Sequence, residues 1–415
     1  MSEFTTNPDR FIFFGCWNSI SENSNLKNTM DALNTHLKKT PEISFVVVGG
    51  DNFYPDKSKK KEKKEKDKED KKKQQKEDES DQSNKDESKK DQSKKDQSKK
   101  DKVKDDECTK IINLNQMEYG FRFLPKIPIY MLLGNHDLET NTNGEKKFCI
   151  QNDKDVTPTP ETENQCTILQ SEKQLVDLHK NIRFGTNFYK IVNNTLLLMI
   201  DTSMYDTNES ESYSPCYAKI MEFRSIEHLR NEQNVWIQTN IKNALDYGVQ
   251  NIIIMGHHPI TGYKVKNDRC ILTQLEQPFL NMWKSVLNLI PSRINVNYLC
   301  ADIHNYQESI IVFNSHLKKP IHQYIVGTGG TELDAKEHIN CPERIFSSNS
   351  NDIITYTLKT NLNSVHGFLD CNCYGERPTF TFIQNNVLAG KKKQKTRKNL
   401  NKLRKKVKSK KFRRI

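Results

Sequence analysis

The sequence predicts an α/β fold in which short buried strands alternate with amphipathic helices. The first observation is a set of short apolar runs typical of buried strands, at 11–14, 43–48, 129–133, 195–200, 251–255 and 297–300. The second is the helical spacing of apolar residues between some of these runs, at 26–37 and 233–244. The third is a polar turn directly after each run, where open α/β proteins bind their ligands.

The part of the chain after His304 has a different pattern, with consecutive strands and no helix between them. The expected strands lie at 309–313, 323–326, 353–358 and 379–383. Because such a run of strands needs a partner for its apolar face, we expect a sheet that closes against the first one.

One segment is too polar to belong to a packed core. The mean hydropathy of the 415 residues is -0.82, which averages unlike segments. Residues 57–107 contain 21 Lys and 17 Asp plus Glu, with no aromatic side chain. Such a stretch cannot bury enough surface to offset the entropy of ordering it, so we expect a disordered insertion. The five-residue repeat within 85–102 is too short for a solenoid.

The C-terminal segment 391–415 is a basic tail with 15 Lys plus Arg and no acidic residue. The tail and the insertion carry +15 and +4 of the formal charge of +12, so the rest of the chain has -7. The basicity therefore belongs to appendages of a mildly acidic globular domain, residues 1–390 with the insertion at 57–107. The tail favours contact with a nucleic acid or an anionic surface. Nuclear targeting, or virion association for a chain of viral origin, would use the same charge.

The N-terminus and the cysteine pattern predict an intracellular, soluble monomer. No secretory signal precedes the first apolar run, and no run of about 18 apolar residues occurs. The ten cysteines have no repeated CxxC spacing, so they do not indicate a structural zinc site. We expect most of them to be reduced thiols, with Cys149 and Cys166 as the pair that oxidation would join.

Five strand ends carry the residues that can do chemistry. They are GCWN at 15–18, GDNFY at 50–54, GNHD at 134–137, GHHP at 256–259 and ADIHN at 301–305. Metals that activate phosphate esters need oxygen and imidazole ligands around an open position. The candidate ligands of that kind are Asp51, Tyr54, Asn135, His257 and His304. Each motif alone is more often an ordinary turn, but their order along the chain favours a metal site.

At these residues the sequence resembles the calcineurin-like metallophosphoesterases. GDNFY is similar to the tyrosine-bearing motif of the purple or tartrate-resistant acid phosphatase branch. The resemblance extends to MIDTSMYD at 199–206, to the helix that contains Trp236, and to VGTGGTELD at 326–334. It implies two mixed β-sheets packed as a sandwich flanked by helices, with a dinuclear metal site at the carboxyl ends of the strands.

The resemblance also implies how the candidate ligands are shared between two ions. Asp51 would bridge both ions, Tyr54 and His304 would bind the first, and Asn135 and His257 the second. A tyrosine ligand implies a ferric ion, so iron paired with zinc or manganese is the expected metal content.

Three further residues gain roles from the resemblance. His136 would lie near the leaving-group oxygen as a proton donor or electrostatic aid, and Asp137 would hold its ring. His258 would either touch the substrate phosphate or support a ligand from behind.

The sequence departs from the family pattern at two ligand positions. Cys16 stands where an aspartate is usual, and Asp302 where a histidine is usual. Asp302 retains an anionic oxygen donor. Cys16 would bind a softer ion such as zinc as a thiolate, or serve only as a packing residue. Asn18 or water would then complete the first site, and a single occupied metal remains an alternative.

Two functions follow from these observations. The first is a metal-dependent phosphatase that hydrolyses phosphomonoesters by attack of a metal-bound hydroxide, with activity reduced by the two substitutions. The alternative is a catalytically degenerate phosphatase fold that acts as a scaffold or binds polyanions through its basic tail.

Overall fold

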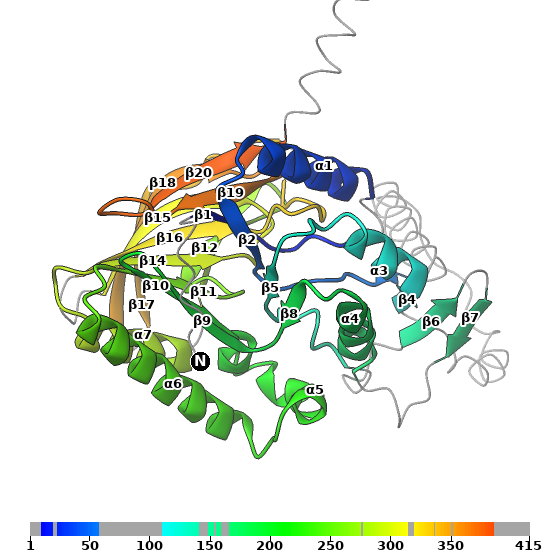
Figure 1. The fold of residues 1–415 in the computed structure, drawn as a ribbon, viewed down its shortest axis with the longest axis horizontal. Helices are drawn as coiled ribbons and strands as arrows, with labels where there is room; N and C mark the ends of the chain where they lie inside the picture. The colour runs from blue at the N-terminus through cyan, green and yellow to red at the C-terminus, as the bar shows by residue number, and fades with distance from the viewer. Residues whose placement is uncertain are drawn as a thin grey trace, which may run out of the picture.

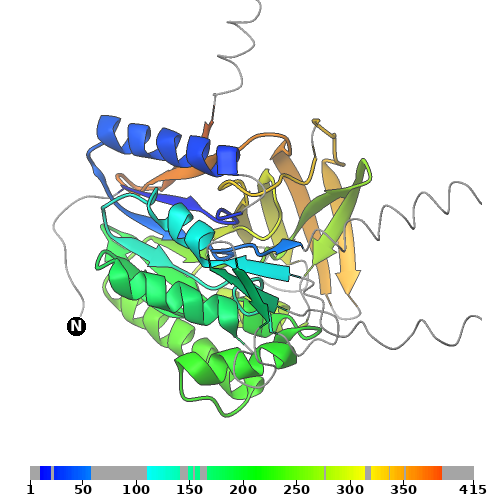
Figure 2. The same cartoon turned by 90° about the vertical axis from the view of Figure 1, so that its right-hand side faces the viewer.

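The computed structural model shows two large β-sheets packed together, with helices on both outer sides (Figures 1 and 2). It describes residues 10–19, 23–57, 110–140, 148–152, 155–158, 166–274, 277–313, 319–335, 337–349 and 352–385. The predicted α/β class and sandwich are confirmed.

The first sheet has six strands in the order β20-β19-β1-β2-β5-β8. Its strands are β1 (Arg10–Phe14), β2 (Ile43–Val48), β5 (Ile129–Met131), β8 (Ile182–Phe184), β19 (Gly367–Asn372) and β20 (Thr379–Gln384). The pairs β1–β2, β2–β5 and β5–β8 are parallel, and β19 and β20 add antiparallel strands at one edge.

The second sheet has eight strands in the order β17-β18-β15-β16-β14-β11-β10-β9. They are β9 (Asn187–Val192), β10 (Thr195–Ile200), β11 (Asn251–Met255), β14 (Asn295–Cys300), β15 (Tyr306–Phe313), β16 (Pro320–Val326), β17 (Arg344–Asn349) and β18 (Asp352–Leu362). Its centre is parallel, from β10 through β11 and β14 to β16.

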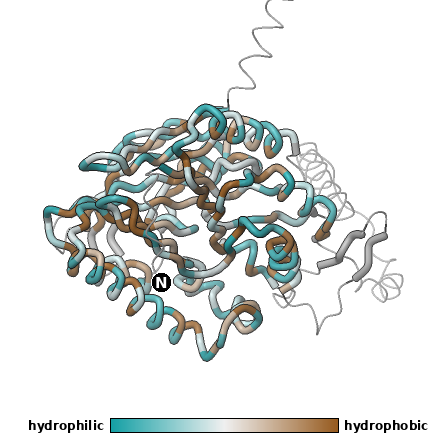
Figure 3. Tube along the Cα trace, in the orientation of Figure 1, coloured by the Kyte–Doolittle hydropathy of each residue, from teal (hydrophilic) through white to brown (hydrophobic). Residues whose placement is uncertain are grey.

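Strand β10 shows why the central strands are continuous apolar runs. Its alternate side chains point to opposite faces of the sheet, so Leu196 and Leu198 pack towards the helices while Leu197 and Met199 join the core between the sheets. Both faces are covered, which is the usual condition of parallel strands. Figure 3 shows hydrophobic residues gathered along these central strands.

Helices cover the outer face of each sheet. They are α1 (Asn23–Lys39), α3 (Leu114–Phe121), α4 (Thr167–Leu178), α5 (Ser214–Ile220), α6 (Ile226–Asp246) and α7 (Gln277–Leu289), with the short 3-10 helices η2 (Ser203–Tyr205) and η3 (Ser210–Tyr213). Helix α1 packs Leu26, Met30 and Leu33 against the first sheet, and α6 packs Ile237 and Ile241 against the second. The three- and four-residue spacing of these side chains is the pattern that predicted both helices.

Of the strands predicted after His304, those at 309–313, 323–326 and 353–358 lie in the sheet that closes against the first one, whereas the strand at 379–383 does not. Strands β15, β16 and β18 extend the sheet that contains β11 and β14, whereas β19 and β20 extend the sheet that contains β1. The reason is that β16 pairs in parallel with β14, and β19 pairs antiparallel with β1. These pairings join segments far apart in sequence, which local patterns do not encode.

Two smaller sheets lie beside the sandwich. One pairs β12 (Thr261–Lys266) with β13 (Arg269–Gln274). The other contains β3 (Asp56–Lys57), β4 (Lys110–Asn113), β6 (Phe148–Asn152) and β7 (Asp155–Pro158). Because β3 pairs antiparallel with β4, the chain returns from the lysine-rich insertion beside the place where it left. Residues 58–107 and the tail at 391–415 lie outside the described residues, and predictions about them stay predictions.

Among the described residues, two disulfides overturn the predicted pairing of Cys149 with Cys166. Cys166 pairs with Cys216, and Cys270 pairs with Cys341, across 50 and 71 positions of the sequence. The predicted pairing of Cys166 with Cys149 was therefore wrong. The described cysteines outside these two disulfides are Cys16, Cys300, Cys371 and Cys373. The spacing of cysteines along the chain did not predict these pairs, because tertiary packing brings together parts of the chain that are distant in sequence.

Among the described residues, no helix is long and apolar enough to cross a membrane.

Candidate functional site

The loops after β1, β2, β5, β11 and β14 meet at one edge of the two sheets, as the parallel strand ends predicted. Two glycines make this close approach possible. Gly50 has a φ of +88°, and a Cβ there would lie 2.7 Å from the backbone N of Gly134. A Cβ on Gly134 would clash with the side chain of Asp51. Both positions therefore need glycine.

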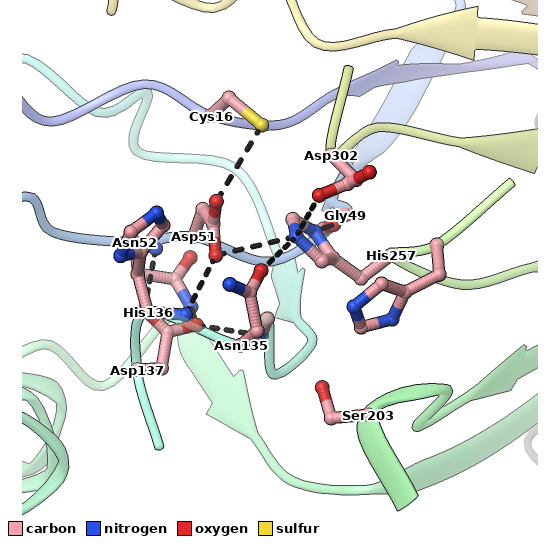
Figure 4. A network of polar contacts seen from close by, with 12 residues as sticks. Cys16, Gly49, Asp51, Asn52, Asn135, His136, Asp137, Ser203, His257 and Asp302 are labelled. Atoms are coloured by element: carbon pink, nitrogen blue, oxygen red, sulfur yellow. Dashed lines mark hydrogen bonds and ion pairs between the residues drawn. The ribbon is translucent and has the colours of Figure 1, made fainter. Parts of the chain in front are cut away.

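Asp51 lies at the centre of the site, with its side chain buried (Figure 4). Its Oδ2 accepts from the hydroxyl of Tyr54 at 2.6 Å and faces the Sγ of Cys16 at 3.8 Å. Its Oδ1 accepts from the backbone N–H of His136 at 3.1 Å and lies 3.2 Å from Nε2 of His257. Burial raises the pKa of Asp51, but the His257 and His136 rings outweigh it and hold the pKa well below its usual range. The two carboxylate oxygens thus face different sets of donors.

The first donor group consists of Cys16, Asp51, Tyr54 and His304. The ligand atoms of Cys16, Asp51 and His304 lie within 4.8 Å of one another, and Nε2 of His304 lies 3.0 Å from the Tyr54 hydroxyl. Burial lowers the pKa of His304 to about 4, so its ring is neutral near pH 7 and has a nitrogen lone pair to offer. Burial, and then Asp51, raise the pKa of the Cys16 thiol well above its usual range.

The second donor group consists of Asn135, His257 and Asp302, together with the shared Asp51. Nε2 of His257 lies 3.1 Å from Oδ1 of Asn135 and 3.9 Å from Oδ1 of Asp302. Its Nδ1 donates to the carbonyl of Gly49 at 2.7 Å, which leaves Nε2 as the ligand nitrogen. Burial lowers the pKa of His257, but Asp51 outweighs this effect and raises the pKa to about 9. A bound cation would displace that proton.

His258 adjoins the second donor group. One of its ring nitrogens lies within 4.8 Å of a ring nitrogen of His257 and of a carboxylate oxygen of Asp302. The Thr202 hydroxyl contacts Nδ1 of His258 at 3.0 Å and also accepts from the backbone N–H groups of His257 and His258. Burial and the neighbouring His257 ring lower the pKa of His258 to about 4, so this imidazole is neutral.

The carboxylate that contacts the His136 ring is Glu139, which corrects the role expected for Asp137. Oε1 of Glu139 lies 2.8 Å from Nδ1 of His136. The oxygens of Asp137 instead accept from Asn52 and from the backbone N–H of Gly134. Burial, and then Asp51, raise the pKa of Asp137 to about 6. Asp137 therefore ties together the two loops that carry Asp51 and Asn135.

Asn18, the alternative ligand of the first donor group, has its side chain against helix α3. Its amide Nδ2 donates to the carbonyl of Met117 at 3.1 Å, and its side chain lies against Gly120 in helix α3. The side chain is held by α3 rather than by the residues around Asp51.

Sequence reasoning missed Glu139 and Thr202. Glu139 comes three residues after His136 in the same tight turn, which is a spacing that allows a side-chain contact. Thr202 follows the end of strand β10, at the same sheet edge as the other loops. The position of Thr202 just after a predicted buried strand is the sequence signal that could have identified it.

The two donor groups fit metal ions in their chemistry. Carboxylate, amide and phenol oxygens with imidazole nitrogens suit divalent and trivalent first-row metals, and a thiol adds affinity for softer ones. A shared carboxylate between two such groups is the arrangement of metal-dependent hydrolases.

Comparison with known families identifies the class. The model of the calcineurin-like phosphoesterases matches residues 9–282, and the chain belongs to this family. The members of this family are phosphoester hydrolases that generally bind divalent metals. No curated protein matches the chain.

Proposed function

We propose that this protein is a phosphomonoesterase similar to the purple acid phosphatases, with two metal ions bridged by Asp51. The observation that supports it best is the orientation of Asp51. One of its oxygens faces Cys16 and Tyr54, and the other faces His257. A carboxylate placed in this way can serve two ions at once.

The first donor group would hold iron, and the second zinc or manganese. Tyr54, with its hydroxyl 3.0 Å from His304, is the phenol expected of a ferric ligand. Asp302 supplies an anionic oxygen to the second group, where the family usually has a histidine. Bound ions of this kind act as Lewis acids towards phosphoryl groups and lower the pKa of water.

The residues of this chain would bind the ester and handle the leaving group. Asn135 and His258 would hold oxygens of the phosphoryl group, because the amide and the neutral imidazole both offer hydrogen-bond donors. His136 would protonate the leaving alcohol. Glu139 accepts from Nδ1 of His136, so it fixes the tautomer and stabilises the charged ring.

Hydrolysis of an aryl phosphate after loading with iron, manganese or zinc tests this function. We expect metal-dependent turnover, and we expect Asp51→Asn to lower kcat about 10³-fold, equivalent to about 4 kcal/mol. The control Asp31→Asn removes an exposed carboxylate that pairs with Lys27 on helix α1, so turnover should stay unchanged. Lack of turnover in every metal, or an Asp51→Asn variant as active as the unaltered protein, would overturn the proposal.

The second candidate is a degenerate phosphatase fold that binds polyanions through the tail at 391–415. The burial of Cys16 favours it, because a buried neutral thiol is a poor ligand for iron or manganese. Elemental analysis separates the two functions. About two metals per chain would contradict the scaffold, whereas metal-free protein with tail-dependent RNA or DNA binding would support it.

A further inference from the structure

The hydroxyl of Ser203 is a buried polar group without a hydrogen-bond partner among the described residues. Ser203 begins the short helix η2, three residues after strand β10 ends, and its exposed fraction is 0%. Buried polar groups are nearly always hydrogen-bonded, so an exception beside a functional site points to a ligand.

The backbone of Ser203 is held in place from both sides. Its N–H donates to Oδ1 of Asp201 at 2.8 Å, and Oδ2 of Asp201 accepts from the hydroxyl of Tyr217 at 2.7 Å. On the other side, the preceding Thr202 contacts the backbone of His257 and His258. This anchoring places Ser203 next to the loop that supplies the second donor group.

The side chain points into the site. Figure 4 shows the Ser203 hydroxyl directed towards the half of the site that contains Asn135 and His257. The competing acceptor is Asp201, whose pKa burial raises to about 6, while the hydroxyls of Tyr217 and Ser203 partly offset this rise. The Ser203 hydroxyl lies near Asp201 without making a hydrogen bond of normal geometry. Each oxygen of Asp201 already accepts one hydrogen bond, so a phosphoryl oxygen would compete only with the remaining lone pairs of Asp201 for the Ser203 proton.

We propose that Ser203 donates a hydrogen bond to a phosphoryl oxygen of the substrate, beside Asn135 and His258. This assignment rests on the proposed phosphomonoesterase function. A hydroxyl that donates to an anionic oxygen makes a charge-assisted bond, and exclusion of bulk water strengthens it.

Binding of inorganic phosphate to metal-loaded protein tests the assignment, with Ser203→Ala compared by titration calorimetry. We expect phosphate to bind roughly 10- to 100-fold more weakly, which is the range for a lost hydrogen bond to a charged group. Ser203→Cys, which keeps the size but offers a weaker donor, should also bind phosphate more weakly. We expect kcat/KM to fall by the same factor for aryl and alkyl phosphates.

The matched control is Ser210→Ala. Ser210 is also buried and begins the next short helix, η3, but its hydroxyl accepts from Nη2 of Arg230 at 3.0 Å. The Ser210→Ala variant should bind phosphate as tightly as the unaltered protein does. Unchanged phosphate affinity in folded, metal-loaded Ser203→Ala would overturn the assignment. Weakened phosphate binding in a protein that hydrolyses no ester would overturn the proposed reaction and support the assignment of Ser203.

Discussion

The two donor groups that share Asp51 differ in how they replace a ligand usual in the family. In the first group the replacement is Cys16, a fully buried thiol whose pKa is raised by burial and by Asp51. In the second group it is Asp302, whose side chain is 25% exposed and remains an oxygen donor. The second group therefore keeps a set of hard ligands, whereas the first depends on a thiol that must lose its proton.

The backbone at these positions shows a further difference. Cys16, Asp51 and Asp302 all have positive φ, at 54°, 54° and 50°. Aspartate is enriched in this left-handed region, whereas cysteine is not. The conformation at position 16 thus suits the aspartate that the family usually has there. The comparison teaches that both replaced positions have the same left-handed backbone as Asp51, although their side chains differ.

The largest expected effect comes from removing one imidazole from each group. We expect His257→Ala to lower kcat about 10³-fold, or by about 4 kcal/mol, because its group holds the harder donors and contacts Asp51 directly. His304→Ala should cost roughly tenfold, because its group is already weakened at Cys16. Elemental analysis and aryl phosphate kinetics of both variants measure the difference. Equal losses would break the proposed ranking of the two groups.

A smaller effect should follow from restoring a carboxylate to the first group. We expect Cys16→Asp to bind Mn²⁺ roughly 10- to 100-fold more tightly, which corresponds to about 1.4–2.8 kcal/mol. The reasons are the harder donor and the positive φ, which aspartate tolerates. Titration of metal-free protein measures this. Cys300→Ala, which removes another buried thiol, is the control. Unchanged Mn²⁺ affinity in Cys16→Asp would show that position 16 does not face the ion.

An effect as small as that of His304→Ala should come from changing the partner of His136. Glu139→Gln keeps the size of the side chain but removes the negative charge 2.8 Å from Nδ1 of His136. We expect kcat to fall about tenfold, near the lower end for loss of a supporting carboxylate. The pH above which kcat declines should also fall, because the charged ring loses its stabilising partner. Glu118→Gln, from an exposed pair with Arg122, should leave the pH profile unchanged.

Much of the fold could be predicted because strand cores carry a local signal. The boundaries predicted for β2, β10 and β11 match the structure, since each is a continuous apolar run buried on both faces. Strand β5 ends at Met131, two residues before the predicted end. The sheet to which β19 belongs could not be predicted, because its antiparallel partner β1 lies more than 350 positions away.

The same division applies to the site. The loops that carry Asp51, Asn135, His257 and His304 could be placed together, because parallel strands bring their carboxyl ends to one edge. The contact between Glu139 and His136 could not be predicted from the sequence. Asp137 and Glu139 lie in one tight turn, and only the conformation of this turn decides which carboxylate contacts the His136 ring.

The sequence by itself determined which strands are buried and which loops bear the candidate ligands, because both depend on side chains close together in the chain. The tertiary structure alone decided the sheet of each C-terminal strand, the pairing of Cys166 with Cys216 and of Cys270 with Cys341, and the direction of the Ser203 hydroxyl. Each of these depends on the packing of segments that are distant in sequence, and such packing has no local pattern to reveal it.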